Sequence, residues 1–349
     1  MPETILGGVR PIRLTIAIPT YDRHECLAST INWLLPQLTS ECHVLIVDNA
    51  SQPPVIDTVG PVLAEFGIST ARVVRNKANI GANANILRCM ELCETEWLWI
   101  LSDDDRIWDD AVAKIFEEIA DHPTSTCVNF AQNAYPRNEA STTSGRTEFL
   151  NVLSRHFDTL LFVSTSAYRV KAILPSITYG YMQIASWAPH LAVLLMAINR
   201  SGGVYFSAKT IVKHIPARKR SGWSRFWVDR GLPLLLDLPF EARDRELLRK
   251  VLHSRLHLKG LLGAYVDVMC YGWRTRDLAL CSQLYRMFAL RRATVTRSLN
   301  EWLLTRGLLI TLLAPNLALK AMQLFYRVAM GRTLEDRAAL VGLSPEERV

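Results

Sequence analysis

Short apolar runs alternate with amphipathic segments over the first 130 residues. The runs predict five strands, at residues 14–18, 44–47, 72–75, 97–101 and 126–130. Two intervening segments carry apolar side chains at helical spacing: Leu27, Ile31, Leu34, Leu35 and Leu38, then Val112, Ile115, Phe116 and Ile119. Alternating strands and helices are typical of βαβ units. We therefore expect an α/β fold with a mostly parallel, Rossmann-like sheet flanked by helices.

The rest of the chain has a different pattern. Residues 132–146, QNAYPRNEASTTSGR, have turn composition and no apolar period, which predicts a loop or flap beside a subdomain break. From Glu241 onward the pattern is helical, with leucine-rich and arginine-rich faces. We expect a first domain at residues 1–235, with halves at 12–130 and 131–235, and a C-terminal helical, basic region at 236–349.

Composition and charge change this picture in one respect. With 349 residues and 49% hydrophobic content the chain can bury a sizeable core, which excludes disorder as its main state. Residues 1–216 carry 17 basic and 21 acidic side chains (net −4), whereas residues 217–349 carry 23 and 12 (net +11). Because the basic residues alternate with leucine and aromatic residues, the rear half favours a membrane surface over nucleic acid.

The segment at residues 307–330, GLLITLLAPNLALKAMQLFYRVAM, is the most apolar part of this basic half, and Pro315 interrupts it. Two interpretations stay open: the segment lies in a membrane interface, or it packs as a helical cap on the core. Neither a signal peptide nor a run of 18 uncharged apolar residues occurs in the sequence. Seven cysteines without a C-x-x-C pair favour a reducing compartment, so we expect a cytoplasmic protein.

Polar residues follow three of the predicted strands. Residues 19–23 (PTYDR) follow the first strand, Asp48 ends the second, and Asp103, Asp104 and Asp105 follow the fourth. Ligands of open α/β sheets bind beyond the carboxyl ends of the strands, so these three clusters are expected to share one crevice.

Three consecutive aspartates repel one another unless a positive charge lies among them. A divalent cation fits best, and ligands that are all oxygen select Mg²⁺ or Mn²⁺. The alternative is an acidic turn without a ligand. The nearby Asp109 and Asp110 are interpreted as ordinary capping residues of the next helix.

Other polar residues near these strand ends have two interpretations each. Asp48 is suited to a base N–H or a ribose hydroxyl, but it also suits a turn. Tyr21 is able to stack on a base or simply pack, and Arg23 to bind phosphate or cap its neighbourhood. In RNKANIGANANIL, Gly81 permits close backbone approach and Asn83 can bond the loop.

Taken in order, the segments IAIPTYDR, LIVDNAS, RNKANIGANAN and WILSDDD resemble the amino-terminal half of family 2 glycosyltransferases, which have the GT-A fold and use nucleotide-sugar donors. The resemblance spans about residues 12–120 and makes 12–130 the donor half and 131–235 the acceptor half. It implies that one group of residues lines the base pocket: Pro19, Thr20, Tyr21 and Arg23. It further implies that Asp48 recognises the base and that Gly81 and Asn83 border the donor.

The resemblance also implies the centre of the site. Asp103 reaches the ribose, and Asp104 or Asp105 holds Mn²⁺ or Mg²⁺ on the diphosphate, so that Asp105 is needed for turnover. Such enzymes often draw a further metal or phosphate contact from a histidine near the end of the sheet. His214 is the candidate here, with Arg218, Lys219 and Arg220 able to close over the pyrophosphate. The alternative for His214 is a surface residue at a strand end.

The chain departs from the family at the position of the general base. Inverting members usually place an acidic residue at the start of the helix after the acceptor loop, but GYMQIASWAPHLAVLLMA contains no carboxylate. His190 is the remaining proton acceptor of suitable pKa in this stretch. Alternatively, His190 begins a buried helix and hydrogen-bonds locally. A retaining route needs no such base, so the stereochemical outcome stays open.

These features predict transfer of a sugar from a nucleoside-diphosphate donor to a hydroxyl, assisted by a metal. The basic, apolar rear half suggests a polyprenyl-diphosphate-linked glycan acceptor at the inner face of the membrane, in polysaccharide or lipopolysaccharide assembly. Two other functions are alternatives to this one. A sugar nucleotidyltransferase would need a glycine-rich loop after the first strand, which PTYDRHE lacks. A non-catalytic carbohydrate-binding or scaffold protein would retain the fold without the base. The sequence identifies neither the nucleotide and sugar nor the oligomeric state.

Overall fold

A computed structural model of the chain describes residues 13–65, 71–213, 230–255, 262–263, 265–270, 278–296 and 298–330. The chain divides into two compact units, residues 1–184 with 189–215, and residues 185–188 with 216–349. The sequence pattern placed a domain boundary at residue 235. The candidates His214, Arg218, Lys219 and Arg220 lie outside the described residues.

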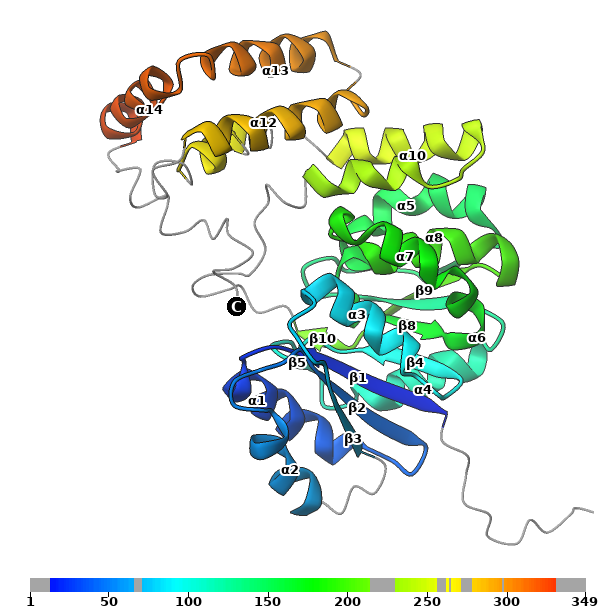
Figure 1. Ribbon diagram of the computed structural model, residues 1–349. Helices are drawn as coiled ribbons and strands as arrows, with labels where there is room; N and C mark the ends of the chain where they lie inside the picture. Colours follow the sequence, from blue (N-terminus) through cyan, green and yellow to red (C-terminus); the bar gives the residue numbers. More distant parts are fainter. Residues whose placement is uncertain are drawn as a thin grey trace, which may run out of the picture. The chain divides into compact units, whose positions relative to one another are not determined.

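The first unit is built on an eight-stranded mixed sheet with the strand order β3-β2-β1-β4-β8-β6-β9-β7 (Figure 1). Its strands are β1 (Leu14–Thr20), β2 (Cys42–Asp48), β3 (Ala71–Arg75), β4 (Trp97–Ile100), β6 (Cys127–Ala131), β7 (Ser141–Thr142), β8 (Ser166–Arg169) and β9 (Val204–Thr210). A second, two-stranded sheet pairs β5 (Arg106–Ile107) with β10 (Val212–Lys213). The five strands predicted from the sequence are all present, to within two residues at each end.

The first four of those strands are parallel neighbours, as the βαβ pattern predicted. Strands β1, β2 and β4 form almost continuous apolar runs because the sheet is covered on both faces there, whereas the edge strand β3 is only partly buried. The fifth predicted strand, β6, does not continue this parallel set. Strand β8 lies between β4 and β6 and pairs antiparallel with both. Its four residues, SAYR, are too few and too mixed in polarity to show a strand period.

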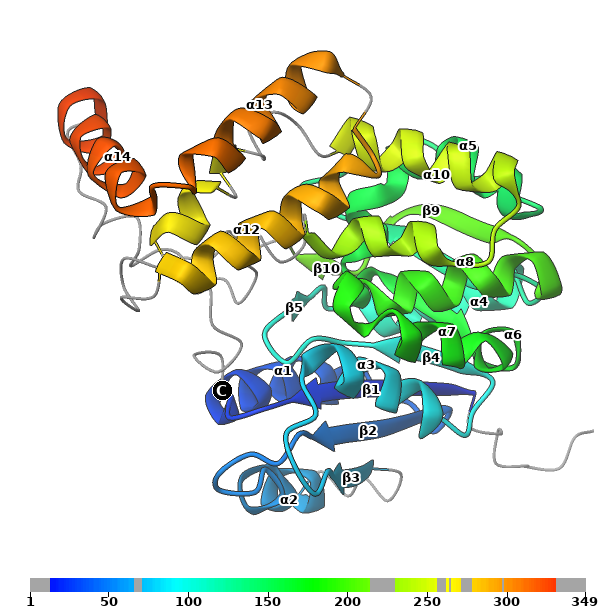
Figure 2. The same cartoon turned by 45° about the horizontal axis from the view of Figure 1, so that its top comes forward.

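Helices cover both faces of the sheet (Figure 2). They are α1 (His24–Leu34), α2 (Ile56–Glu65), α3 (Ala82–Glu91), α4 (Ala111–Asp121), α5 (Arg146–Leu161), α6 (Val170–Ile173), α7 (Ile177–Met182) and α8 (Pro189–Ser201), with 3₁₀ turns at Leu35–Gln37, Val163–Thr165, Leu174–Ser176 and Ile184–Ser186. Apolar residues of α1, α2 and α4 form one core with β1, β2 and β4, and the predicted helical positions Leu27 and Ile115 lie within it. Helix α3 packs on β1, β2 and β4, and it also contacts α7 and α8.

The polar segment at residues 132–146 is more ordered than a loop. It contains the short edge strand β7, and α5 begins at its last residue. Arg137 anchors it: the guanidinium donates to the carbonyls of Asn129 (2.6 Å) and Ser207 (2.9 Å), to the Thr159 hydroxyl (2.6 Å) and to His156 Nδ1 (3.1 Å). Burial lowers the pKa of Arg137 to about 10. A two-residue strand and a single anchoring side chain leave no periodic signal in the sequence.

The second unit is helical, as predicted. Its described elements include a 3₁₀ segment at Leu232–Asp237 and the helices α10 (Ala242–Arg255), α12 (Leu278–Ala293), α13 (Leu299–Thr311) and α14 (Pro315–Met330). Pro315 begins α14, so the predicted interruption is a boundary between two helices. A small core around Tyr265, Tyr285 and Phe288 packs α12, α13 and α14 together with residues 265–270.

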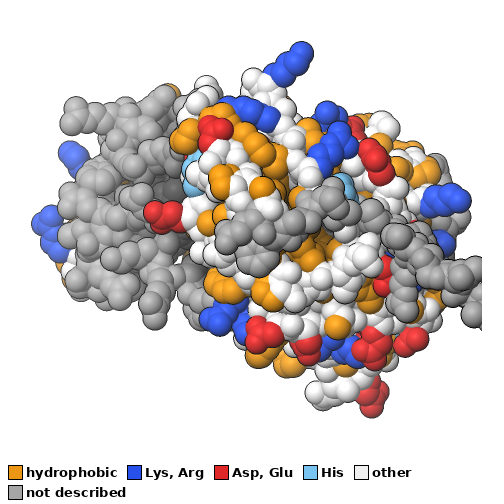
Figure 3. Space-filling view, turned by 90° about the horizontal axis from the view of Figure 1, so that it is seen from below, with side chains coloured by type: hydrophobic (Ala, Val, Ile, Leu, Met, Phe, Trp, Pro, Cys, Tyr) orange, Lys and Arg blue, Asp and Glu red, His pale blue; other side chains and the backbone are white. Residues whose placement is uncertain are grey.

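Among the described residues, no single helix is long and apolar enough to cross a membrane. Helices α13 and α14 are long and apolar enough only when taken together, and they are bent by 109° where they meet. One face of the molecule, viewed in Figure 3, carries cationic and anionic side chains interspersed with scattered apolar ones. Mixed charges of this kind are typical of a solvated surface.

Candidate active site

Three polar segments meet at the carboxyl ends of β1, β2 and β4. The strands are paired so that Thr20 lies opposite Asp48 and Ala17 opposite Ile100. The Thr20 hydroxyl donates to Asp103 Oδ2 at 2.7 Å, and the Thr30 hydroxyl of α1 donates to the Asp103 carbonyl at 2.9 Å. The segment after β1 is thus joined to the acidic turn after β4, as the sequence predicted.

Arg23 lies between two of the three aspartates. Its Nη1 donates to Asp103 Oδ1 at 2.8 Å and its Nη2 to Asp104 Oδ2 at 2.5 Å. The remaining oxygen of Asp104 accepts a hydrogen bond of 2.6 Å from the Ser102 hydroxyl. Arg23 therefore supplies a positive charge within the acidic turn, where the sequence analysis expected a cation.

The carboxylates of Asp103 and Asp104 differ in their environments. Burial raises the pKa of Asp103 to about 6, although Arg23 and Thr20 oppose the shift. Burial also acts to raise the pKa of Asp104, but the Ser102 hydroxyl and Arg23 outweigh it and the pKa is lowered. At pH 7 both groups are ionised, so Asp103 accepts hydrogen bonds at a site that is only 3% exposed.

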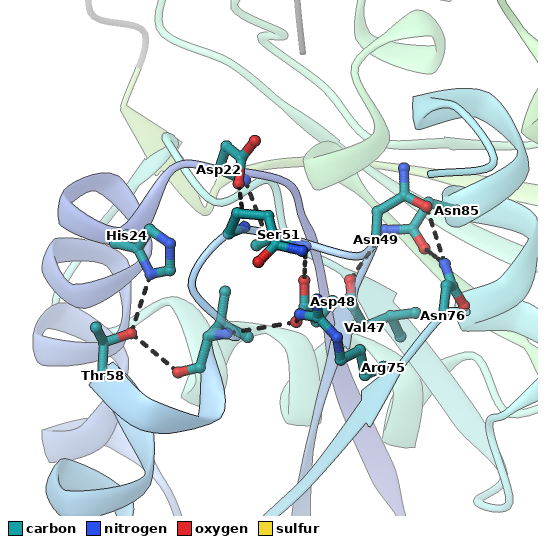
Figure 4. A network of polar contacts seen from close by, with 12 residues as sticks. Asp22, His24, Val47, Asp48, Asn49, Ser51, Thr58, Arg75, Asn76 and Asn85 are labelled. Carbon is teal, nitrogen blue, oxygen red and sulfur yellow. Dashed lines mark hydrogen bonds and ion pairs between the residues drawn. The ribbon is translucent and has the colours of Figure 1, made fainter. Parts of the chain in front are cut away.

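Asp48 is held by groups from the turn after β2 and from β3 (Figure 4). Its Oδ1 accepts from the Ser51 backbone N–H at 2.8 Å, and its Oδ2 accepts from the Val55 N–H at 3.3 Å and from Arg75 Nη1 at 2.5 Å. The residue is 1% exposed. Burial acts to raise the pKa of Asp48, but the hydrogen bonds from Ser51, Arg75 and Val55 lower it overall. Asp48 thus shapes the turn after β2, the alternative that the sequence left open beside base recognition.

A second contact joins the turns after β1 and β2. Asp22 has a positive φ of 48°; its N–H donates to Ser51 Oγ at 3.0 Å, and its Oδ1 accepts from the Gln52 N–H at 2.6 Å. The preceding residues Pro19 and Tyr21 are partly buried at the same edge. The residues assigned to the base pocket therefore occupy one edge of the sheet.

Asparagine side chains fix the segment that enters α3. Asn76 Nδ2 donates to Asn49 Oδ1 at 3.0 Å and to Asn85 Oδ1 at 2.8 Å (Figure 4). Asn49 Nδ2 donates to Asn79 Oδ1 at 2.7 Å. Gly81 takes a φ of 84°, which favours glycine, and its N–H donates to Asn79 Oδ1 at 2.8 Å. The predicted turn is therefore rigidly placed beside β2.

The outer candidates are positioned differently. Asn83 Nδ2 donates to the Ile184 carbonyl at 2.9 Å, which links α3 to the 3₁₀ turn after α7. Asp105 is partly exposed, and its backbone N–H donates to the Ser102 carbonyl at 3.3 Å. Asp110 occupies the N-cap position of α4, but its carboxylate makes no capping hydrogen bond and pairs with Lys114 at 2.9 Å. The interpretation of Asp110 as a helix cap therefore applies to its position and not to its carboxylate.

His190, the candidate general base, is 2% exposed in the first turn of α8. Its Nε2 lies 3.0 Å from the Leu160 carbonyl, and its Nδ1 has no hydrogen-bond partner among the described residues. Burial lowers the pKa of His190 to about 4, so the imidazole is neutral at pH 7. The burial favours the packing role that the sequence kept as the alternative.

Arg75 and the asparagines Asn49 and Asn76 are site residues that motif reasoning missed. A signal for them existed: β2 and β3 are parallel and paired, which sets Asp48 directly opposite Arg75. When the strand ends VDN (47–49) and VRN (74–76) are aligned, Arg75 lies beside Asp48 and Asn76 lies beside Asn49.

The acidic turn fits a divalent cation in the type of its donors. Asp104 is exposed and Asp105 partly so, and Mg²⁺ or Mn²⁺ usually takes one or two carboxylates with water and substrate phosphates completing its shell. Among the described residues, no three His, Cys, Asp or Glu side chains converge as a complete protein cage. A cation at Asp104 would share that carboxylate with Arg23 or displace it.

Comparisons with known proteins agree with this geometry. Residues 15–174 match the family model "Glycosyl transferase family 2". An uncharacterized glycosyltransferase of Haemophilus influenzae is 27% identical over 117 residues, which span 34% of this chain and 37% of that protein. The chain thus matches little more than a third of that relative's length.

Solved structures share the fold. The crystal structure of S. aureus TarS 1-349 matches with a TM-score of 0.57 and 16% identity, covering 86% of this chain and 88% of that one. TarS 1-349 in complex with UDP-GlcNAc matches with a TM-score of 0.56 and 15% identity, covering 86% and 89%. The family expected from four sequence segments is confirmed for residues 15–174, which match the glycosyl transferase family 2 model, and the solved structures share the fold of the chain.

Proposed function

We propose that the chain transfers a sugar from a nucleoside-diphosphate donor to a hydroxyl acceptor, with the donor bound at the carboxyl ends of β1, β2 and β4. The observation that carries the proposal is the junction of Thr20, Arg23 and Asp103 beside Asp104 and Asp105. An acidic turn at this place in an α/β sheet suits a sugar nucleotide whose diphosphate is bound through a cation.

In this scheme each residue has a defined task. Ionised Asp103 accepts a hydrogen bond from a ribose hydroxyl, and the Thr20 hydroxyl fixes its orientation. Asp104 and Asp105 hold Mn²⁺ or Mg²⁺, which when bound neutralises charge on the departing diphosphate. Tyr21 and Pro19 border the base, while Gly81 and Asn83 border the donor from the α3 side.

Two further residues have more restricted assignments. Asp48 is 1% exposed, and its carboxylate already accepts from Ser51, Val55 and Arg75. Recognition of a uracil or guanine N–H by Asp48 would therefore require one of these donors to be displaced. His190 as general base would require access that its burial opposes, so we rest no step on its proton transfer.

The acceptor assignment follows from the second unit. We propose a polyprenyl-diphosphate-linked glycan in surface polysaccharide synthesis, with the chain held peripherally at the cytoplasmic face of the membrane. The net charge of +11 at residues 217–349 and the apolar helix pair α13 and α14 support it.

Nucleotide-dependent thermal stabilisation tests the donor site without knowledge of the acceptor. UDP, GDP, CDP and dTDP are each added with and without Mn²⁺, and we expect a shift for one base that requires the metal. At a ligand concentration of about 100 times Kd the stabilisation is about 2.7 kcal/mol. Asp104→Asn should abolish the shift. Asp109→Asn is the matched control, because Asp109 is fully exposed and its ion pair with Lys213 is long at 3.8 Å.

The same measurement separates the alternatives. A metal-dependent shift followed by no turnover on any acceptor would favour a non-catalytic carbohydrate-binding protein that kept the fold. That outcome is favoured specifically by the missing carboxylate and the buried His190. No shift with any nucleotide would contradict the proposed donor site.

A further inference from the structure

Helix α13 carries apolar side chains on two faces: Leu304, Leu308 and Leu309 pack on the core of the second unit, and a second set is exposed. Leu299, Trp302, Leu303 and Ile310 are 45–69% exposed, and their spacing places them on one stripe of the helix. Two residues that point inward, Glu301 and Thr305, are polar and each 8% exposed. In water this arrangement leaves the four apolar side chains of the stripe uncovered.

The neighbouring helix continues this surface. In α12, Met287 is 48% and Leu290 is 72% exposed. A groove of about 460 Å³ between α12 and α13 is lined by Leu290, Leu309, Ile310 and Leu313 together with Arg286 and Arg306. Both ribbon views show the two helices side by side (Figures 1 and 2). We call this the α12–α13 face.

Helix α14 repeats the pattern. Leu317, Leu324 and Val328 are 63–75% exposed and lie on one stripe, which Lys320 joins at helical spacing. Exposed apolar surface on three consecutive helices exceeds what scattered surface leucines explain, and such surface marks an interaction site.

The charge of these helices identifies the occupant. Residues 278–330 contain seven Lys or Arg and one acidic residue, Glu301. Glu301 is itself buried and accepts from Arg292 Nη2 at 3.2 Å, so it does not offset the exposed cations. Arg306 stacks on Trp302 with 4.3 Å between the guanidinium carbon and the ring centroid. A tryptophan beside an arginine is typical of a membrane interface.

We propose that the α12–α13 face, extended by α14, binds the surface of a bilayer that contains anionic phospholipids. The proposal deepens the proposed function, on whose membrane contact it rests, by naming the surface and the class of lipid. Cations along an apolar stripe meet lipid phosphates while the leucines enter the acyl boundary. A second copy of the chain fits less well, because self-association would bring six net positive charges per copy together.

The lengths of the helices favour lying on the bilayer over crossing it. Helices α13 and α14 have 13 and 16 residues, which at 1.5 Å per residue extend about 20 and 24 Å. The hydrocarbon core is about 30 Å thick. Each helix is therefore too short to span alone, and each exposed stripe carries a cation that remains at headgroup level.

Vesicle flotation of the full chain tests the proposal. The vesicles are phosphatidylcholine alone or phosphatidylcholine mixed with phosphatidylglycerol, each at low and high salt. We expect binding to the anionic vesicles that weakens with salt. The double variant Leu303→Asp/Ile310→Asp should bind at least about tenfold more weakly, since two apolar anchors are lost and two anionic charges are gained. Met182→Asp, at a 69% exposed apolar residue of the first unit, is the matched control and should bind as wild type does.

Three results would overturn the proposal. The first is no binding of wild type to anionic vesicles, and the second is equal binding by wild type and the double variant. The third is self-association of the wild type that the double variant abolishes, which would identify a second copy as the occupant. Arg286→Gln/Arg306→Gln supplies an independent arm that removes charge only and should weaken anionic binding. Nucleotide-induced stabilisation of the same proteins reports the donor site separately, so failure of the membrane surface is distinguishable from failure of the proposed function.

Discussion

Replacing Arg75 by leucine removes the cation that contacts the buried carboxylate of Asp48. The two atoms lie 2.5 Å apart, and Asp48 is only 1% exposed, so the variant leaves a buried charge with less compensation. Removing one partner of a fully buried pair costs about 3–5 kcal/mol. Arg75 is one-third exposed, and Asp48 keeps two backbone N–H donors, from Ser51 and Val55. We therefore expect Arg75→Leu to lower the free energy of unfolding by about 2 kcal/mol.

The pH dependence of this loss follows from the direction of the pKa shift. In the wild type the folded pKa of Asp48 is lowered, so its contribution to stability is present above the unfolded pKa and is lost as the pH falls through the folded pKa. Without Arg75 the pKa of Asp48 rises. The difference in stability between wild type and variant should be full at pH 7 and shrink below about pH 4.

Urea unfolding at both pH values measures these differences, and a double-mutant cycle isolates the pair. The cycle compares Arg75→Leu, Asp48→Asn and the double variant, for which we expect a coupling energy of about 1 kcal/mol or more. Arg72→Leu is the matched control on the same strand, because Arg72 pairs at 3.1 Å with the exposed Glu94 and should contribute less than about 0.5 kcal/mol. Additive effects in the cycle, or equal losses for Arg72→Leu and Arg75→Leu, would refute the reasoning.

Three further predictions concern single residues. Asp105→Ala should abolish turnover and remove the metal-dependent part of nucleotide binding in a thermal-shift assay, and unchanged turnover would contradict the metal assignment. Arg137→Leu should lower the free energy of unfolding by about 3 kcal/mol in urea, because acceptors on Asn129 and Ser207 lose a buried donor; a loss below about 0.5 kcal/mol would show that the polar segment holds without it. If His190 packs and does not act as a base, His190→Ala should reduce stability without a selective loss of kcat, whereas a large fall in kcat with unchanged donor affinity would restore the base.

The strand pattern predicted the donor half because that half is built from local units. Each parallel strand of the first four is followed by its own helix, and the apolar residues of both elements repeat within a few positions. Strand β8 was not predicted because it is a strand only through its pairing with β4 and β6, between which it lies. Both partners are distant from β8 along the chain. A strand of four residues is too short for its alternation of polar and apolar residues to predict such a pairing.

The candidate site shows the same division. Thr20 and Asp103 could be placed together, since both follow strands that end at one edge of the sheet. The ion pair of Arg23 with Asp104 could not, because it depends on the path of the turn after β1, where Asp22 takes a positive φ. The three aspartates predicted a bound cation, and Arg23 already supplies one positive charge among them. A metal ion at Asp104 would therefore have to share this carboxylate with Arg23 or displace it. The charge of the donor's diphosphate would then contribute much of the affinity for the metal ion.

The C-terminal helices show why hydropathy alone left two interpretations open. An apolar segment that caps a core and one that enters a membrane interface have the same mean composition. They differ in which residues face inward. In α13 the inward positions include Leu304 and Leu308 beside Glu301 and Thr305, while Leu303 and Ile310 face outward. A helix that served only as a cap would have few large apolar side chains on its outer face, because leaving them in water forgoes the free energy of burial. The apolar stripe that stays exposed, rather than the apolar content of the helix, is therefore what favours the membrane surface.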